Sequence, residues 1–452
     1  MGALPPKVKV LEMFSVAPPP QSVTEVSLPL TFFDLQWLRH PPLQILYFFR
    51  LTHFTETLLH NIKHSLSLTL QHFYALAGNL TWPRESEKPV LRFIDEDSVC
   101  LTLAECYSDF HRFSAKNYMW DVNEYQSLLP DLPTSDTLAS AMALQVTVFP
   151  NSGVCVGITV HQAVADGNTI TLFMKEWASS CRLGGGGDHP SPRLSYDRTI
   201  IKDSQGIERL LLTRLLESNL SEPKSQNRSL KLSENRDLFN IVQATFVLSS
   251  SDVERLRKWV VSGPDGDKYA KHTTRYALAC AYVWICLVKA EGASRRKAHF
   301  VFSAGCRTRL DPPVPMTYFG NCIRANLVTM DMSQLLGEDG MAVAVEAIDK
   351  TVKQLDNGVL RDLAETDSAI TAAARSERLV SVSWSPKLSV YDIDFGWGKP
   401  RKVEIASVWK SGAFSMVESR DGDGGVEVGL ALGRKQMHVF ASLFVSGLEA
   451  TG

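Results

Sequence analysis

A glycine run near the middle of the chain constrains the fold more strongly than any other feature of the sequence. Residues 184–187 are all glycine, and the segment that follows, to about residue 237, is rich in Ser, Asn, Lys and Arg. Consecutive glycines lose the most conformational entropy on ordering, so no helix or strand is expected here. A chain of 452 residues, 44% of them apolar, can build more than one core. We therefore predict two lobes, residues 1–182 and 238–452, joined by a linker at residues 183–237.

Strand and helix patterns alternate on both sides of this break. In the first half, apolar residues at three- and four-residue spacing predict a helix over residues 54–76, and alternating or continuous apolar runs predict a hairpin at 143–160 with a helix at 168–179. The second half predicts a strand, two helices, a hairpin and a last amphipathic helix, at residues 241–248, 250–261, 272–290, 413–432 and 437–448.

The charge and cysteine content exclude several classes of partner. The 47 basic and 49 acidic residues give a formal charge of -2, without the single-sign runs that bind nucleic acid or anionic lipid. Eight cysteines are scattered without a C-x-x-C pair, as in a reduced cytosolic protein. The N-terminus lacks the apolar core of a signal peptide, and the most apolar stretch is too short to cross a bilayer. We expect a monomeric, soluble, cytoplasmic protein.

Two patterns resemble metal sites, but we expect neither to bind a metal. His60 and His64 lie one helical turn apart, yet no carboxylate or Cys partner is evident nearby, so they fit a solvated helix face. The acidic, glycine-rich residues 421–425 lack the later Glu of an EF-hand loop and lie where the C-terminal hairpin needs a turn.

Six separate segments match the pattern of one known family, in that family's order. The chain resembles the BAHD family of plant acyl-CoA-dependent acyltransferases, and the resemblance covers about residues 28–445. The segments that carry it are Leu28 to Asp34, Phe73 to Leu80, Phe173 to Ala178, Tyr196 to Thr199, Tyr318 to Cys322 and Asp394 to Gly398.

The resemblance implies an α/β, two-lobed fold similar to chloramphenicol acetyltransferase, with mixed sheets and a solvent channel between the lobes. Acyl-CoA would enter this channel from one side as co-substrate and the acceptor from the other, and no further cofactor is implied. The form Tyr318-Phe319-Gly320-Asn321-Cys322 is similar to that of members that acylate anthocyanins and other flavonoid or phenolic glycosides. Their donors are malonyl-CoA or hydroxycinnamoyl-CoA.

The sequence departs from the family at the catalytic motif, His-x-x-x-Asp-Gly. The corresponding stretch is Val160-His161-Gln162-Ala163-Val164-Ala165-Asp166-Gly167, in which His161 lies one residue too far from the aspartate. Either one residue is inserted and His161 remains the base, or Gln162 replaces the motif histidine. We favour substitution, because many related enzymes have two histidines here and the residues after Gln162 match without a gap. If the strand continues, His161 then points to the opposite face unless a bulge turns it.

This register decides whether the chain has a general base. Esterification needs a hydroxyl to lose its proton as it attacks the thioester, and imidazole titrates near neutral pH whereas a carboxamide has no usable basicity. Losing base assistance costs about 10²- to 10⁴-fold in rate. We therefore expect Gln162 to leave weak residual turnover that depends on positioning and electrostatic effects.

The resemblance also implies roles for residues around the motif. Asp166 is expected to turn away from the channel and pair with Arg307 or Arg309, although an ordinary loop aspartate is the alternative. Gly305 stands where relatives usually carry an acid.

Four further residues have two interpretations each. Asp394 is either a catalytic group or, as we favour, a brace for its own loop. Trp397 carries an indole N–H that could stabilise the oxyanion of the thioester, although tryptophan is more often a core residue. Thr273 and Thr274 match a segment near CoA, where helix amides could meet phosphate, but an ordinary helix cap explains them equally well.

Three functions remain open on these grounds. The first is an O-acyltransferase of phenolic glycosides that is impaired at position 162. The second is a catalytically silent protein that keeps its affinity for CoA or for the glycoside. A carrier-protein-dependent condensation enzyme is the third, and the segments at 318–322 and 394–398 are foreign to that group.

Overall fold

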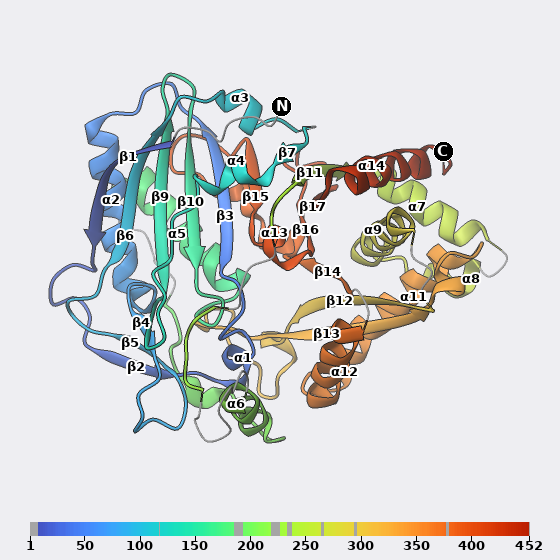
Figure 1. Ribbon diagram of the computed structural model, residues 1–452, viewed down its shortest axis with the longest axis horizontal. Helices are drawn as coiled ribbons and strands as arrows, with labels where there is room; N and C mark the ends of the chain where they lie inside the picture. Colours follow the sequence, from blue (N-terminus) through green and yellow to red (C-terminus); the bar gives the residue numbers. More distant parts are fainter. Residues whose placement is uncertain are drawn as a thin grey trace.

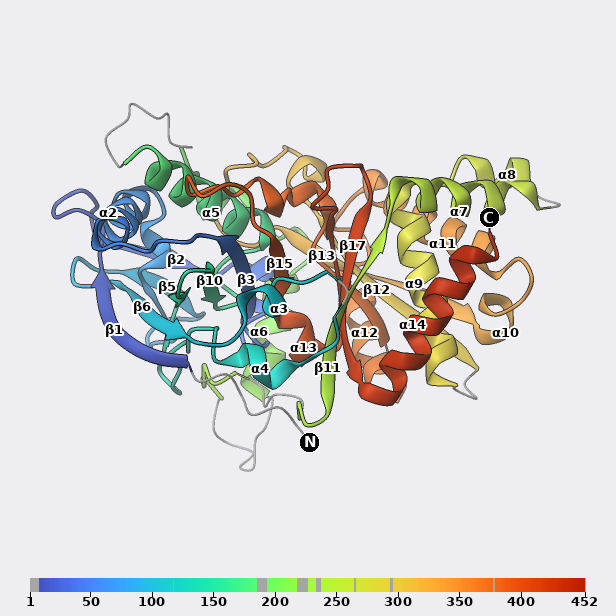
Figure 2. The ribbon, with the colours of Figure 1, turned by 90° about the horizontal axis from the view of Figure 1, so that it is seen from above.

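The structure is a computed structural model that describes residues 8–116, 118–184, 193–217, 227–232, 237–263, 266–292, 296–376 and 379–451. Two large mixed sheets lie side by side along the long axis of the molecule, each with helices packed on it (Figures 1 and 2). Each sheet is the centre of one lobe.

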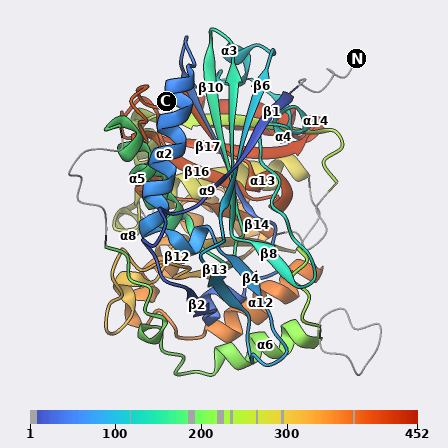
Figure 3. The same ribbon diagram turned by 90° about the vertical axis from the view of Figure 1, so that its left-hand side faces the viewer.

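The first lobe contains a six-stranded sheet in which only β6 and β9 pair in parallel. Strand β10 is buried along its whole length, as its continuous apolar run predicts. Figure 3 shows β1 at the outer edge of this sheet. In spatial order its strands are β1 (Val8–Val16), β6 (Val99–Cys106), β9 (Met142–Phe149), β10 (Gly153–Val160), β3 (Leu43–Arg50) and β15 (Lys402–Ile405).

Two long helices, α2 (Glu56–His72) and α5 (Gly167–Arg182), pack against each other beside this sheet. The Trp177 indole N–H of α5 donates to the carbonyl of Ile62 on α2, 3.2 Å away and out of contact with water. A small sheet completes the lobe, with the order β2 (Val26–Pro29), β5 (Val90–Phe93), β4 (Asn79–Thr81) and β8 (Leu138–Ser140).

The second lobe contains a seven-stranded sheet that buries helix α9 (Arg275–Glu291), whose residues from Ala277 to Val288 are all buried. Within the described part of the chain, no helix is both long and apolar enough to span a membrane. The strands in spatial order are β13 (Ile323–Asp331), β12 (Lys297–Gly305), β14 (Leu379–Ser383), β16 (Phe414–Glu418), β17 (Val426–Gly433), β11 (Ile241–Leu248) and β7 (Trp120–Asp121).

The other helices of the second lobe surround α9 or cover the far strands (Figure 1). They are α7 (Ser250–Ser262), α8 (Gly266–Ala270), α10 (Met332–Leu335), α11 (Gly340–Gln354), α12 (Leu363–Ser376) and α14 (Arg434–Glu449). Among the described residues, short helices also occur at α1 (Phe32–Leu35), α3 (Phe110–Phe113), α4 (Val122–Gln126) and α13 (Ser407–Ser411).

The two lobes exchange strands. Strand β15 comes from the C-terminal half but pairs with β3 in the first sheet, and β7 comes from the N-terminal half but pairs with β11 in the second. The boundaries at residues 182 and 238 therefore separate most of each sheet but not all of it. The segment 394–398 also packs in the first lobe, where Phe395 contacts Trp177 of α5.

The linker predicted at residues 183–237 contains a helix that the sequence analysis missed. Helix α6 (Ile207–Glu217) buries Ile207 and Leu211 against the first lobe. Its apolar residues recur at helical spacing, but the polar residues on either side hide the pattern in a composition average. Residues 185–192, 218–226 and 233–236 of this linker, including most of the glycine run, lie outside the described residues.

Candidate functional site

The motif residues form the turn that connects β10 to α5. The His161 N–H donates to the carbonyl of Ala141 at 2.9 Å, so the sheet pairing continues one residue past the end of β10. The Val164 N–H then donates to the carbonyl of His161 at 2.9 Å and closes the turn. Asp166 is the N-cap of α5, and its carboxylate accepts from the Thr169 N–H at 3.0 Å. The turn is thus fixed at both ends.

His161 points into the protein, where its side chain is 0% exposed. Its Nδ1 accepts a hydrogen bond from the Ala163 N–H at 3.2 Å, so the neutral ring carries its proton on Nε2. Among the described residues, Nε2 has no hydrogen-bond partner. Burial disfavours the charged imidazolium and lowers the pKa of His161 to about 4.

Gln162 is only half-buried, and its backbone is held by Asn321. Its carbonyl accepts from Nδ2 of Asn321 at 3.1 Å. Within the described part of the chain, the carboxamide of Gln162 has no hydrogen-bond partner. A carboxamide can donate to and accept from a ligand, but it cannot take a proton from a hydroxyl near neutral pH.

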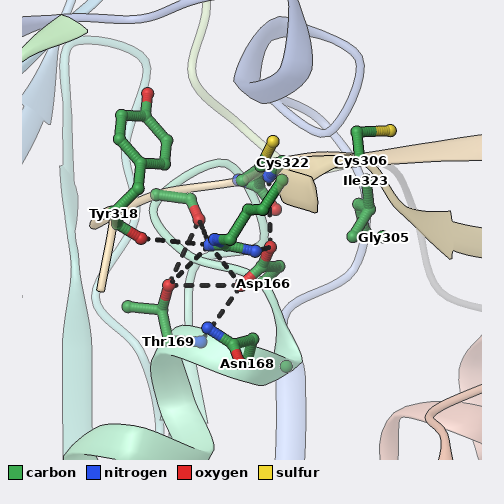
Figure 4. Close-up of polar contacts among 12 residues, drawn as sticks. Asp166, Asn168, Thr169, Gly305, Cys306, Tyr318, Cys322 and Ile323 are labelled. Carbon is green, nitrogen blue, oxygen red and sulfur yellow. Dashed lines mark hydrogen bonds and ion pairs between the residues drawn. The ribbon is translucent and has the colours of Figure 1, made fainter. Parts of the chain in front are cut away.

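The carboxylate of Asp166 lies at the centre of a buried polar cluster (Figure 4). Arg307 Nη1 and Nη2 donate to its two oxygens at 2.6 and 3.1 Å. The Cys322 N–H donates to the same carboxylate at 3.1 Å. Side chains of Asp166 and Arg307 are 1% and 4% exposed, so both charges are compensated inside the protein.

Arg307 also ties the motif to the 318–322 segment. Its Nη2 donates to the carbonyls of Tyr318 and Gly320 at 3.0 and 2.9 Å. Arg309, the other arginine considered for Asp166, instead pairs with the exposed Asp356 at 2.9 Å and donates to the carbonyl of Gly305 at 3.0 Å. Of the two arginines, the structure brings only Arg307 to Asp166.

The 394–398 segment lies at the opposite end of α5. Oδ1 of Asp394 accepts from the N–H groups of Gly396 and Gly398 at 2.8 and 2.9 Å, so the carboxylate closes its own loop. Gly396 packs beside Arg182, the last residue of α5. Since α5 has 16 residues and is about 24 Å long, this loop is remote from the turn that precedes the helix.

Trp397 packs its ring against aromatic neighbours in the same region. Its ring centroid lies 5.4 Å from that of Phe49 on β3 and 5.0 Å from that of Phe395. The structure does not bring Trp397 together with Gln162. Trp397 is partly buried and packs against the hydrophobic core of the first lobe.

Thr273 and Thr274 lie in the second lobe, directly before the first residue of α9. The Thr274 hydroxyl accepts from the Ala277 N–H at 3.3 Å, which makes it the N-cap of α9. The Thr273 hydroxyl donates to the carbonyl of Ala270 at 2.9 Å. Both hydroxyls therefore satisfy local backbone groups, and the helix begins after them rather than at residue 272.

Two further residues touch the start of α5 and were not assigned from the sequence. A side chain at Gly167 would lie 3.1 Å from the Leu388 side chain and 3.4 Å from the Trp384 ring, so a larger residue is crowded here. Trp384 has φ of 68°, an unusual backbone conformation for a bulky residue. No local sequence pattern predicts this backbone conformation at Trp384.

A shallow pocket opens where α1 and α6 face the second lobe. Its walls are largely apolar, with Gln36 and Asp367 as the polar groups. The lining residues are Phe32, Gln36, Ile207, Leu210, Leu211, Ala325, Leu363, Ala364 and Asp367.

The profile of the Transferase family matches residues 7–445, almost the whole chain. The chain belongs to this family, the BAHD acyltransferases. It is 36% identical to malonyl-coenzyme A:anthocyanin 3-O-glucoside-6''-O-malonyltransferase of Dahlia pinnata, over 98% of each chain. Agmatine coumaroyltransferase of Arabidopsis thaliana is 34% identical, over 97% of this chain and 98% of the relative.

A solved structure gives the same fold for this BAHD protein. Vinorine synthase superimposes with a TM-score of 0.72 at 18% sequence identity, over 97% of this chain and 98% of the other. The predicted two-lobed α/β fold with mixed sheets is confirmed. The predicted channel between the lobes stays a prediction.

Proposed function

We propose that this BAHD protein transfers a malonyl or hydroxycinnamoyl group from acyl-CoA to a hydroxyl of an anthocyanin, a flavonoid or another phenolic glycoside, and that Gln162 slows the reaction. The names of several relatives support the substrate class. They include an anthocyanin malonyltransferase, a phenolic glucoside malonyltransferase and a coumaroyltransferase of anthocyanidin glucosides.

One observation carries the proposal for the motif, namely the different burial of His161 and Gln162. A general base must reach the substrate and hold a pKa near the working pH. His161 is fully buried with its pKa lowered to about 4, whereas the half-buried Gln162 is the accessible member of the pair. This difference supports substitution of the base over its displacement by one residue.

The reaction then depends on what remains at the site. The acceptor oxygen forms a bond to the thioester carbonyl carbon, the carbon–sulfur bond breaks, and the hydroxyl proton passes through solvent to the departing sulfur, so that the products are the ester and the free CoA thiol. The Gln162 amide can orient the hydroxyl without taking its proton. Loss of the base raises the barrier by about 3 to 5 kcal/mol, so turnover is slow but not abolished.

A second candidate function is a catalytically silent protein that binds CoA or the glycoside. The glutamine at position 162 favours this second function, because a protein that only has to bind its ligands can lose the general base and keep its binding surfaces.

The experiment separates the two candidates by measuring product and binding on the same preparation. The purified protein is incubated with malonyl-CoA or coumaroyl-CoA and an anthocyanin 3-glucoside, and acylated product is followed by mass spectrometry. Agmatine serves as an alternative acceptor, because one relative acylates that amine. Slow formation of acylated glucoside supports acyl transfer. Calorimetric binding of CoA or glucoside without product supports the silent protein, and acylation of agmatine alone contradicts the proposed acceptor.

A further inference from the structure

Two neighbouring residues of the 318–322 segment hold opposite ends of the motif turn. Asn321 contacts the carbonyl of Gln162 through its side chain, and the Cys322 N–H contacts the carboxylate of Asp166. We propose that Asn321 is a positioning residue, which fixes the backbone at Gln162 and so directs the side chain at the base position. This inference rests on the proposed acyl transfer.

Asn321 is fully buried, and every donor it has in this region is in use. Its Nδ2 donates to the Gln162 carbonyl and to Oδ1 of Asp34, both at 3.1 Å. Its backbone N–H donates to the same Asp34 oxygen at 3.0 Å. Asn321 therefore joins position 162 to the end of the 28–34 segment.

Asp34 determines which way the Asn321 amide faces. An ionised carboxylate only accepts hydrogen bonds, so the NH₂ of the amide and not its oxygen must point toward Asp34. In that orientation the second amide hydrogen is directed at the Gln162 carbonyl. As a result, Oδ1 of Asn321 is buried and has no hydrogen-bond partner among the described residues.

Asp34 is itself held in place. Its other carboxylate oxygen accepts from the N–H and the hydroxyl of Thr31 at 2.9 and 2.8 Å. Arg198 lies 3.5 Å from that oxygen and donates to the Tyr318 hydroxyl at 2.7 Å. Three segments that marked the family in the sequence, at 28–34, 196–199 and 318–322, are thus linked to one another, and Asn321 connects them to the Gln162 carbonyl.

The consequence for chemistry follows because the carbonyl that Asn321 holds is bonded to the Cα that carries the side chain of residue 162. If the Asn321 bond is lost, the peptide group between residues 162 and 163 keeps only the bond from the Ala163 N–H to His161 Nδ1, so its carbonyl can turn and the side chain at position 162 can shift. Displacement of a reacting group by about 1 Å can lower a rate about 10²-fold.

The test uses Gln162→His, which restores an imidazole at the base position, as the background. Asn321→Ala removes the side-chain donor. Asn326→Ala is the matched control, because Asn326 is also buried and also donates to two backbone carbonyls, but on β13 away from the turn. We expect Asn321→Ala to lower kcat at least about tenfold with the KM for acyl-CoA within about twofold, and Asn326→Ala to leave kcat within about twofold. Equal losses in both variants would overturn the proposal.

A second measurement needs no substrate and separates this inference from the proposed function. The introduced imidazole is titrated by NMR in ¹⁵N-histidine-labelled protein, with and without each asparagine substitution. We expect Asn321→Ala to shift that titration and Asn326→Ala to leave it unchanged; an unchanged titration in both overturns the positioning role. An inactive Gln162→His protein contradicts the acyl transfer, while this titration still decides the role of Asn321. If Asn321→Ala does not fold, Asp34→Asn keeps the volume of the site and is expected to give the same shift.

Discussion

Asp166 and Arg307 form a two-pronged ion pair almost completely shielded from water, with N–O distances of 2.6 and 3.1 Å. Asp166 is the N-cap of α5 in the first lobe, and Arg307 lies two residues past the end of β12 of the second sheet. The pair therefore joins the motif turn to the second half of the chain. Each charged group has further hydrogen bonds, so neither charge is left uncompensated.

Replacing Arg307 by Met is expected to destabilise the protein by about 3 to 5 kcal/mol, because the Asp166 carboxylate would stay buried without its partner. The matched control is Arg309→Met, which breaks the pair with exposed Asp356 and the exposed bond to the Gly305 carbonyl, and should cost only about 1 kcal/mol. Unfolding in urea, followed by fluorescence, measures both free energies. Similar losses for the two arginines would contradict the assignment of Arg307 as the structural partner.

Restoring an imidazole at the base position should raise turnover. We expect Gln162→His to increase kcat at least about tenfold, because general-base assistance is worth about 10²- to 10⁴-fold. His161→Ala should lower the turnover of the folded, unmodified protein by less than the loss of a general base would, because the buried ring cannot reach a substrate. Initial rates with acyl-CoA and anthocyanin glucoside test both variants, and circular dichroism verifies folding. If His161→Ala abolishes a robust activity, then the base has moved by one residue and was not lost.

His161 should also make stability depend on pH. Its pKa is about 4 in the folded protein and about 6.5 when unfolded, so between these values the unfolded chain binds the extra proton. Stability is therefore full above about pH 6.5 and falls by on the order of 3 kcal/mol as the pH drops to about 4. His161→Phe should remove this part of the slope, whereas the exposed His60→Gln should leave it unchanged. Urea unfolding at intervals from pH 7 to 4 measures the difference, and identical slopes in the parent and His161→Phe would contradict it.

Local patterns in the sequence identify most elements near the site. The strand predicted at 241–248 matches β11, the helix at 250–261 matches α7 within one residue, and the hairpin at 143–160 corresponds to β9 and β10. These elements carry an alternating or helical apolar period and a clear cap or turn, so local physics alone determines them. Successive side chains of a strand point to opposite faces, which accounts for the full burial of His161 and the partial burial of Gln162.

Contacts between segments that are far apart in the chain could not be predicted from local sequence patterns. Strand β15 has no local feature that assigns it to the first sheet, because its partner β3 lies about 350 residues earlier and pairing is decided by packing. The sequence alone cannot distinguish Arg307 from Arg309 as the partner of Asp166. The turn after β12 places the Arg307 side chain within reach of that carboxylate. The roles of Asp34 and Asn321 likewise depend on a contact across the chain.

The position of Trp397 gives a last prediction, since oxyanion stabilisation requires an N–H within hydrogen-bond reach of the reacting carbonyl. Its loop lies beside Arg182, about 24 Å along α5 from the motif turn. In the Gln162→His background, Trp397→Phe should keep the ring packing against Phe49 and change kcat by less than about threefold. Loss of an oxyanion donor would instead lower kcat about 10²- to 10³-fold with KM little changed. Trp397→Ala distinguishes packing from chemistry, because it should lower the melting temperature by several degrees while the kcat of the folded fraction stays within about threefold.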